Sequence, residues 1–73
     1  LNAALAAIDR GDKVSAEKYL KKAGTGAEVD NARGCLAVLN EDYEAAKQYF
    51  QKAVAGGLKG AQENLNKLNK IVE

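Results

Sequence analysis

The sequence predicts an all-α fold in which antiparallel helical hairpins stack as a short solenoid of about five helices. Three observations support this prediction. Proline is absent and the only aromatic residues are three tyrosines and one phenylalanine, a composition that favours helices over strands. One segment of the chain recurs after thirty residues, a period typical of stacked helical hairpins. Apolar residues also recur at the three- and four-residue spacing of a buried helix face.

The repeat aligns residues 10–23 with residues 40–53 without a gap. Its matched pairs are Asp12 with Asp42, Ala16 with Ala46, Tyr19 with Tyr49, Leu20 with Phe50, Lys22 with Lys52 and Ala23 with Ala53. A chain of 73 residues forms at most one small domain. We divide it into a first hairpin over residues 1–26, a second hairpin over residues 27–57 and a terminal capping helix over residues 58–73.

The first hairpin is predicted to contain helices at residues 1–10 and 12–24. Gly11 can adopt the left-handed conformation that ends helices, and Asp12 is a good cap for the helix that follows. The predicted buried stripes are Leu1, Ala4, Leu5 and Ile8 in the first helix and Ala16, Tyr19, Leu20 and Ala23 in the second. The glycines of Gly24-Thr25-Gly26 then allow the chain to reverse.

The second hairpin is predicted to contain helices at residues 27–40 and 42–55, and Gly56-Gly57 closes it. The buried stripes are Val29, Ala32, Leu36 and Leu39 in the first helix and Ala46, Tyr49, Phe50 and Ala53 in the second. Gly34 lies within the first of these helices, where glycine costs about 1 kcal/mol relative to alanine. We therefore expect Gly34 to mark a close approach between two helices.

The turn of the second hairpin differs from that of the first because Glu41 replaces Gly11. Asparagine tolerates the left-handed conformation better than glutamate does, so the sequence favours Asn40 as the left-handed residue of this turn.

A fifth helix is predicted over residues 58–72. Its apolar residues are Leu58, Ala61, Leu65, Leu68, Ile71 and Val72, and its polar side carries Gln62, Glu63, Asn64, Asn66, Lys67, Asn69 and Lys70. One polar face suits a helix at the end of an array. At the other end, the apolar pattern is already in helical phase at Leu1 with no capping residue before it. We therefore expect the chain to be a piece of a longer polypeptide.

The second hairpin resembles the tetratricopeptide repeat, in which two antiparallel helices pack through small residues. The residues that carry the resemblance are Gly34, Asp42, Tyr43, Ala46, Phe50 and Ala53. The spacing of thirty residues is shorter than the family's usual value of about 34, and no proline follows either hairpin. Short, alanine-rich repeats of this style also resemble those of some bacterial cell-envelope proteins, which implies a bacterial origin.

The resemblance implies a protein-interaction or scaffolding module that binds a peptide or a partner segment in a concave groove. The groove positions carried over from the family are Leu1, Leu5, Ile8 and Asp9 in the first hairpin and Asn31, Cys35, Val38 and Leu39 in the second. Self-association through the exposed ends of the array is a further interaction that the pattern allows. The alternatives are a purely structural end cap or spacer of a longer array, and an accessory domain of a larger envelope protein or enzyme.

Charge and residue types weigh against other functions. Eleven basic and ten acidic residues leave a net charge of +1, too small a field to predict nucleic-acid binding. The lysines of the second helices, Lys18, Lys21, Lys22, Lys47 and Lys52, are interpreted as a solvated surface. The chain has no histidine and one cysteine, so Cys35 is interpreted as a packing residue rather than a nucleophile. We expect no enzymatic activity, cofactor or metal site.

No apolar run approaches the length of a membrane span, and no basic start followed by an apolar stretch marks a signal peptide. We therefore expect no membrane insertion and a soluble chain, located in the cytoplasm, the periplasm or the cell envelope. A single cysteine does not distinguish these compartments.

Overall fold

The computed structural model describes residues 2–72, and the chain forms five α-helices over this range. They are α1 (Asn2–Asp9), α2 (Lys13–Ala23), α3 (Ala27–Leu39), α4 (Tyr43–Ala55) and α5 (Lys59–Val72). The predicted all-α class and the predicted number of helices are confirmed. Each helix begins and ends within one residue of its predicted bounds.

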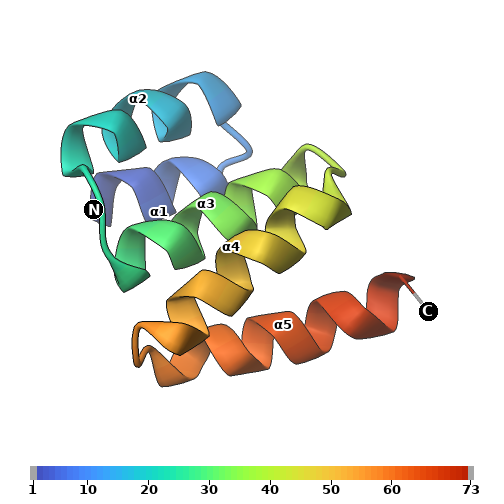
Figure 1. Ribbon diagram of the computed structural model, residues 1–73. Coiled ribbons are helices and arrows are strands. Elements are labelled where there is room, and N and C mark those ends of the chain that lie inside the picture. Colours follow the sequence, from blue (N-terminus) through green and yellow to red (C-terminus); the bar gives the residue numbers. More distant parts are fainter. Residues whose placement is uncertain (1, 73) are drawn as a thin grey trace.

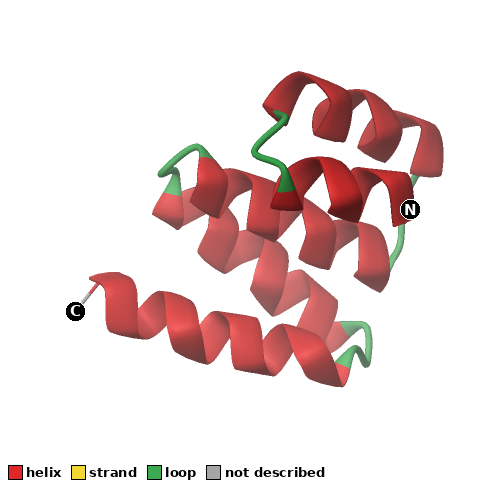
Figure 2. Cartoon of the chain, turned by 180° about the vertical axis from the view of Figure 1, so that it is seen from behind, coloured by secondary structure: helices red, strands yellow, loops and turns green. Residues whose placement is uncertain are grey.

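The helices form a stack in which consecutive helices run side by side in opposite directions. Figure 1 shows α1 and α2 at one end, α3 and α4 in the middle, and α5 at the other end, packed against α4. The view from behind shows the same order, with the two chain ends on opposite sides of the molecule (Figure 2). Helix α3 is central because it packs against all four of the others.

Two groups of buried side chains hold the stack together. The first joins α1, α2 and α3 and consists of Ala4, Ala7, Ala16, Leu20, Val29, Ala32 and Leu36. The second joins α3, α4 and α5 and consists of Ala37, Ala46, Phe50 and Leu68. Alanine dominates the first group, so these helices approach one another closely, whereas Phe50 is the largest buried side chain of the second.

Gly34 allows α3 and α4 to approach at the ring of Phe50. A Cβ atom built on Gly34 would lie 2.5 Å from Cδ1 and 2.9 Å from Cζ of Phe50, closer than carbon atoms can pack. Phe50 is only 2% exposed, so its ring has little room to move away. The predicted close approach at Gly34 is confirmed.

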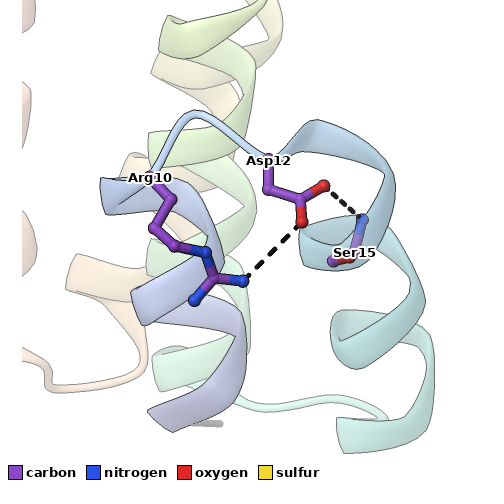
Figure 3. A network of polar contacts seen from close by, with 3 residues as sticks. All are labelled: Arg10, Asp12 and Ser15. Carbon is purple, nitrogen blue, oxygen red and sulfur yellow. Dashed lines mark hydrogen bonds and ion pairs between the residues drawn. The ribbon is translucent and has the colours of Figure 1, made fainter.

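Aspartates cap the second helix of each hairpin, and the sequence predicts the first of these caps, Asp12. Oδ1 of Asp12 accepts a hydrogen bond from the backbone N–H of Ser15 at 3.2 Å, and Oδ1 of Asp42 accepts one from Ala45 at 3.3 Å. Figure 3 shows the first cap, where Nη2 of Arg10 also lies 3.6 Å from Oδ2 of Asp12. Hydrogen bonding from Ser15, and to a smaller degree the charge of Arg10, lowers the pKa of Asp12.

The turn between α3 and α4 corrects one prediction. Glu41, not Asn40, adopts the left-handed conformation, with φ of 61°, whereas Asn40 has φ of −83°. The N–H groups of Glu41 and Asp42 donate to the carbonyls of Val38 and Ala37 at 2.9 and 2.8 Å. This Schellman pattern places the left-handed residue immediately after the cap. The hydrogen-bond geometry therefore overrides the local preference of asparagine.

Burial corrects parts of the predicted apolar stripes. In α1 the stripe is rotated, because Ala4 and Ala7 are fully buried while Leu5 is 38% exposed. Ala23 is exposed because α2 ends at that residue, whereas α4 continues for two residues beyond its counterpart Ala53, which is fully buried. Ile71 of α5 is 55% exposed. Leu1 and the side chain of Val72 lie outside the described residues.

Candidate functional site

The candidate site lies on the side of α3 that is flanked by α1 and α5. Asn31, Cys35 and Val38 follow one another at four- and three-residue spacing, which places them on one side of α3. All three are half-buried. We call this surface the α1–α3–α5 face; it comprises Leu5, Asp9, Asn31, Cys35, Val38, Asn64, Lys67, Leu68 and Ile71.

A pair of side-chain amides joins α5 to α3 on this face. Nδ2 of Asn64 donates a hydrogen bond to Oδ1 of Asn31 at 2.8 Å, and it lies 4.0 Å from Sγ of Cys35. Both asparagines are half-buried, so the bond is partly shielded from water. It fixes the position of α5 relative to the centre of the face.

Charges from both neighbouring helices act on the thiol of Cys35. Burial raises its pKa, and the carboxylate of Asp9 on α1 raises it further, while the ammonium of Lys67 on α5 lowers it by less. The thiol is therefore protonated at neutral pH and is a poor nucleophile. Asp9 and Lys67 belong to α1 and α5, the two helices that flank α3 on this face.

An apolar hollow of about 220 Å³ lies between α3, α4 and α5. It is lined by Cys35, Val38, Phe50, Asn64, Lys67, Leu68 and Ile71. Phe50 and Leu68 are almost completely buried, whereas Ile71 is 55% exposed. The hollow therefore has an apolar floor and walls, with an amide and an ammonium group at its rim, an arrangement that suits an apolar side chain of a partner.

The structure brings some of the predicted groove residues together and separates others. Cys35 and Val38 line the hollow, Asn31 bonds to α5 beside it, and the charge of Asp9 on α1 acts on Cys35. Leu5 is exposed on α1, one turn before Asp9. Of the three remaining predicted residues, Ile8 and Leu39 pack against the first core group and contribute to stability rather than to an open surface, and Leu1 lies outside the described residues.

The sequence interpretation missed the contribution of α5 to this face. Asn64 and Lys67 were assigned to the solvated polar side of the helix, yet both line the hollow. Asn64 follows the buried Ala61 by three residues and precedes the buried Leu68 by four. That helical spacing places Asn64 on the packed side of α5. The sequence alone could therefore have shown that Asn64 is not on the solvated side.

Two other features, a metal-binding cluster and a membrane-spanning helix, do not occur in the described part of the chain. Within residues 2–72 there is no group of three or more histidine, cysteine, aspartate or glutamate side chains placed to hold a metal ion. No helix in that range combines the length and apolar character needed to cross a membrane. Comparisons of the chain with protein-family models, with curated proteins and with solved structures found no match.

Proposed function

We propose that the protein is an interaction or scaffolding module of tetratricopeptide type, which binds an extended peptide or partner segment on the α1–α3–α5 face. The observation that carries the proposal is the apolar hollow between α3, α4 and α5. Its wall includes Ile71, which is 55% exposed. Covering a large apolar side chain that is exposed to water beside a hollow lowers the free energy, which favours binding of a partner.

The rim of the hollow suits a peptide backbone. Asn31 and Asn64 use one donor and one acceptor in their mutual hydrogen bond, so each amide retains further hydrogen-bonding capacity. Asp9 and Lys67 supply opposite charges on the two flanking helices. An extended segment with an apolar side chain in the hollow would therefore meet polar groups on both sides, as in most protein interfaces.

Selection from a display library of short random peptides tests this proposal. Peptides selected on the parent protein are measured against Val38→Glu and Ile71→Glu, which place a charge in the hollow. The matched control is Val54→Glu, at a half-buried valine of α4 that does not line the hollow. Circular dichroism first confirms that each variant is folded. If Val38→Glu does not fold, Ile71→Glu still tests the hollow.

The proposal predicts that selected peptides carry a large apolar residue. It also predicts that they lose at least about tenfold in affinity with the two hollow variants, as expected when a charge is buried against an apolar group. Affinity for Val54→Glu should stay at the parent value. Peptides that bind all four proteins equally would show that the hollow is not the site.

A structural role is the second candidate, and the outer side of α5 favours it. Gln62, Glu63, Asn66, Asn69 and Lys70 are all exposed there, which is the polar surface that an end helix of an array presents to water. If this role is the whole function, the display library yields no peptide that depends on the hollow. The same experiment therefore separates the two candidates.

A further inference from the structure

Positive charge is concentrated on α2, outside the α1–α3–α5 face. The helix carries four lysines and one glutamate, a net charge of +3, so the rest of the chain carries −2 of the total of +1. These five residues, Lys13, Glu17, Lys18, Lys21 and Lys22, are all exposed. A nearly neutral molecule thus has one strongly basic helix.

Helix stability explains only part of this charge. Lys21 and Lys22 lie in the last turn, where cations interact favourably with the carbonyl end of the helix. Lys13 lies at the first position of α2, where a positive charge is unfavourable. Lys18 is adjacent to Lys21 and Lys22 on the helix surface, and like charges at this spacing repel. The only ion pair within residues 2–72 is that of Arg10 with Asp12.

Val14 lies among these lysines and is 81% exposed, more than any other large apolar side chain of residues 3–71. It lines a shallow depression on α2 together with Glu17, Lys18, Lys21 and Lys22. An exposed valine in the first helical turn contributes neither core packing nor the negative charge that favours that position. Val14 and the lysines around it therefore form a surface with one apolar side chain and several positive charges.

The repeat itself supplies an internal comparison. Thirty residues later in the chain, α4 carries Glu44, Gln48 and Gln51 at the positions of Val14, Lys18 and Lys21, and all three are exposed. The two helices keep the same aspartate cap and the same buried alanine. The fold is thus satisfied by acidic and neutral residues at these three positions, so Val14, Lys18 and Lys21 are not required for folding, whereas Lys22 is matched by Lys52.

From this comparison we infer that the exposed face of α2 is a docking surface for an acidic protein segment with an apolar side chain. The lysines attract the acidic residues, and Val14 contacts the apolar one. Insertion into a membrane is disfavoured because the apolar residues Ala16 and Leu20 are completely buried in the core, and an interfacial helix needs a free apolar face. A nucleic acid is disfavoured because the net charge of the whole chain is only +1.

Fluorescence anisotropy with three labelled peptides tests the inference on the 73-residue chain. The first peptide has alternating aspartate and glutamate around a single leucine. The second replaces the leucine with serine, and the third replaces every acidic residue with its amide. The parent should bind the first peptide most tightly and the third not measurably.

Two pairs of variants then locate the site. Lys18→Gln combined with Lys21→Gln gives α2 the residues of α4, and Lys47→Gln combined with Lys52→Gln removes two exposed lysines from α4 as the matched control. The α2 variant should weaken binding of the first peptide by about fivefold or more, as expected for two exposed ion pairs. The control should stay within about twofold. Val14→Ser should weaken binding of the leucine peptide but not of the serine peptide.

Several results would overturn the inference. One is equal loss of binding in the α2 and α4 variants, which would indicate a general charge effect. Another is no binding of the acidic peptides by the parent. Tighter, α2-dependent binding to vesicles that contain phosphatidylserine, or to double-stranded DNA, would assign the surface to a membrane or to a nucleic acid instead. All substitutions are at exposed positions, and circular dichroism confirms that each variant is folded.

Discussion

Substitution of Gly34 by alanine provides the sharpest test of the packing between α3 and α4. Alanine in place of glycine inside a helix contributes about 1 kcal/mol of stability when the added methyl group is free. At Gly34 that methyl would lie 2.5 Å from Cδ1 of the buried Phe50 ring, and overpacking of a core costs about 1 to 3 kcal/mol. The cost exceeds the gain, so we expect a net loss of about 1 kcal/mol.

Gly60 is the matched control because it lies in the first turn of α5 and a Cβ atom there meets nothing within 4 Å. Gly60→Ala should therefore raise stability by up to about 1 kcal/mol. Thermal unfolding followed by circular dichroism should separate the two variants by about 10 °C, since 1 kcal/mol shifts the midpoint of a domain this small by about 4 to 8 °C.

A double-mutant cycle with Phe50→Leu identifies the cause of the loss. Removing the ring opens space beside Gly34, so Gly34→Ala should cost less in the Phe50→Leu background than in the parent, with a coupling energy of at least about 0.5 kcal/mol. If Gly34→Ala raised the melting temperature as much as Gly60→Ala does, the ring could not face Gly34. The packing described between α3 and α4 would then be wrong.

Three further predictions concern the turns, the caps and the thiol. Glu41→Gly should raise the melting temperature, because a left-handed residue with a side chain costs about 1 to 2 kcal/mol and glycine loses only about 0.5 to 1 kcal/mol in entropy; Asn40→Gly should lower it, and the opposite order would contradict the assigned turn. Asp12→Ala and Asp42→Ala should each lower the urea midpoint, corresponding to about 1 kcal/mol for a lost cap. Because hydrogen bonding lowers the pKa of Asp12, its contribution is complete above the usual carboxyl pKa and is lost as the pH falls through the lowered value. The gap between the parent and Asp12→Ala should therefore narrow in acid. Iodoacetamide should alkylate Cys35 more slowly in the folded protein than in urea, because burial raises the thiol pKa; equal rates at the same pH would show that the thiol is not shielded.

The sequence predicts the helices well because their signals are local. Asp12 marks a helix start through its capping oxygen, and the structure confirms this cap and shows the same cap at Asp42. Gly34 is informative for a different reason, since a glycine is unfavourable within a helix unless another group occupies the space of its side chain. The structure identifies that group as Phe50. Local capping chemistry and one unfavourable glycine were thus sufficient to predict the helices of the second hairpin and their close contact.

The errors occur where tertiary structure overrides a local preference. Asparagine adopts the left-handed conformation more readily than glutamate, so Asn40 was the natural expectation. The Schellman hydrogen bonds fix that conformation at the next residue, Glu41. In α1 the predicted buried stripe included Leu5, but close helix packing buries the small Ala7 beside the predicted Ala4 and leaves Leu5 38% exposed.

The candidate site was predictable on α1, through Leu5 and Asp9, and on α3, but not on α5. Asn31, Cys35 and Val38 follow from the resemblance to the tetratricopeptide repeat, and the structure places them on one face. The contribution of Asn64 and Lys67 depends on where α5 packs, which residue spacing within α5 does not specify. The spacing of a polar residue from buried residues shows that it lies on the packed side of its own helix. It does not show which neighbouring helix the residue contacts.

The turn before α5 explains why the hollow exists. The N–H groups of Gly57 and Leu58 donate to the carbonyls of Val54 and Ala53 at 3.0 and 3.1 Å. This is the hydrogen-bond pattern found at the turns within both hairpins, at Gly11 and at Glu41, and Gly57 supplies the left-handed residue with φ of 93°.

The connection between α2 and α3 is different, because Gly24 and Gly26 have φ of 85° and 132° and the Schellman pair of bonds does not occur there. Helix α5 therefore packs along α4 as the second helix of a hairpin packs along the first, more extensively than α3 packs against α2. This placement sets α5 along α4, and α5 reaches α3 through the Asn64–Asn31 hydrogen bond and the packing of Leu68. Cys35, Val38 and Ile71 then line a hollow that a closer contact between α3 and α5 would have filled. The binding surface proposed here is thus a consequence of the turn at Gly57.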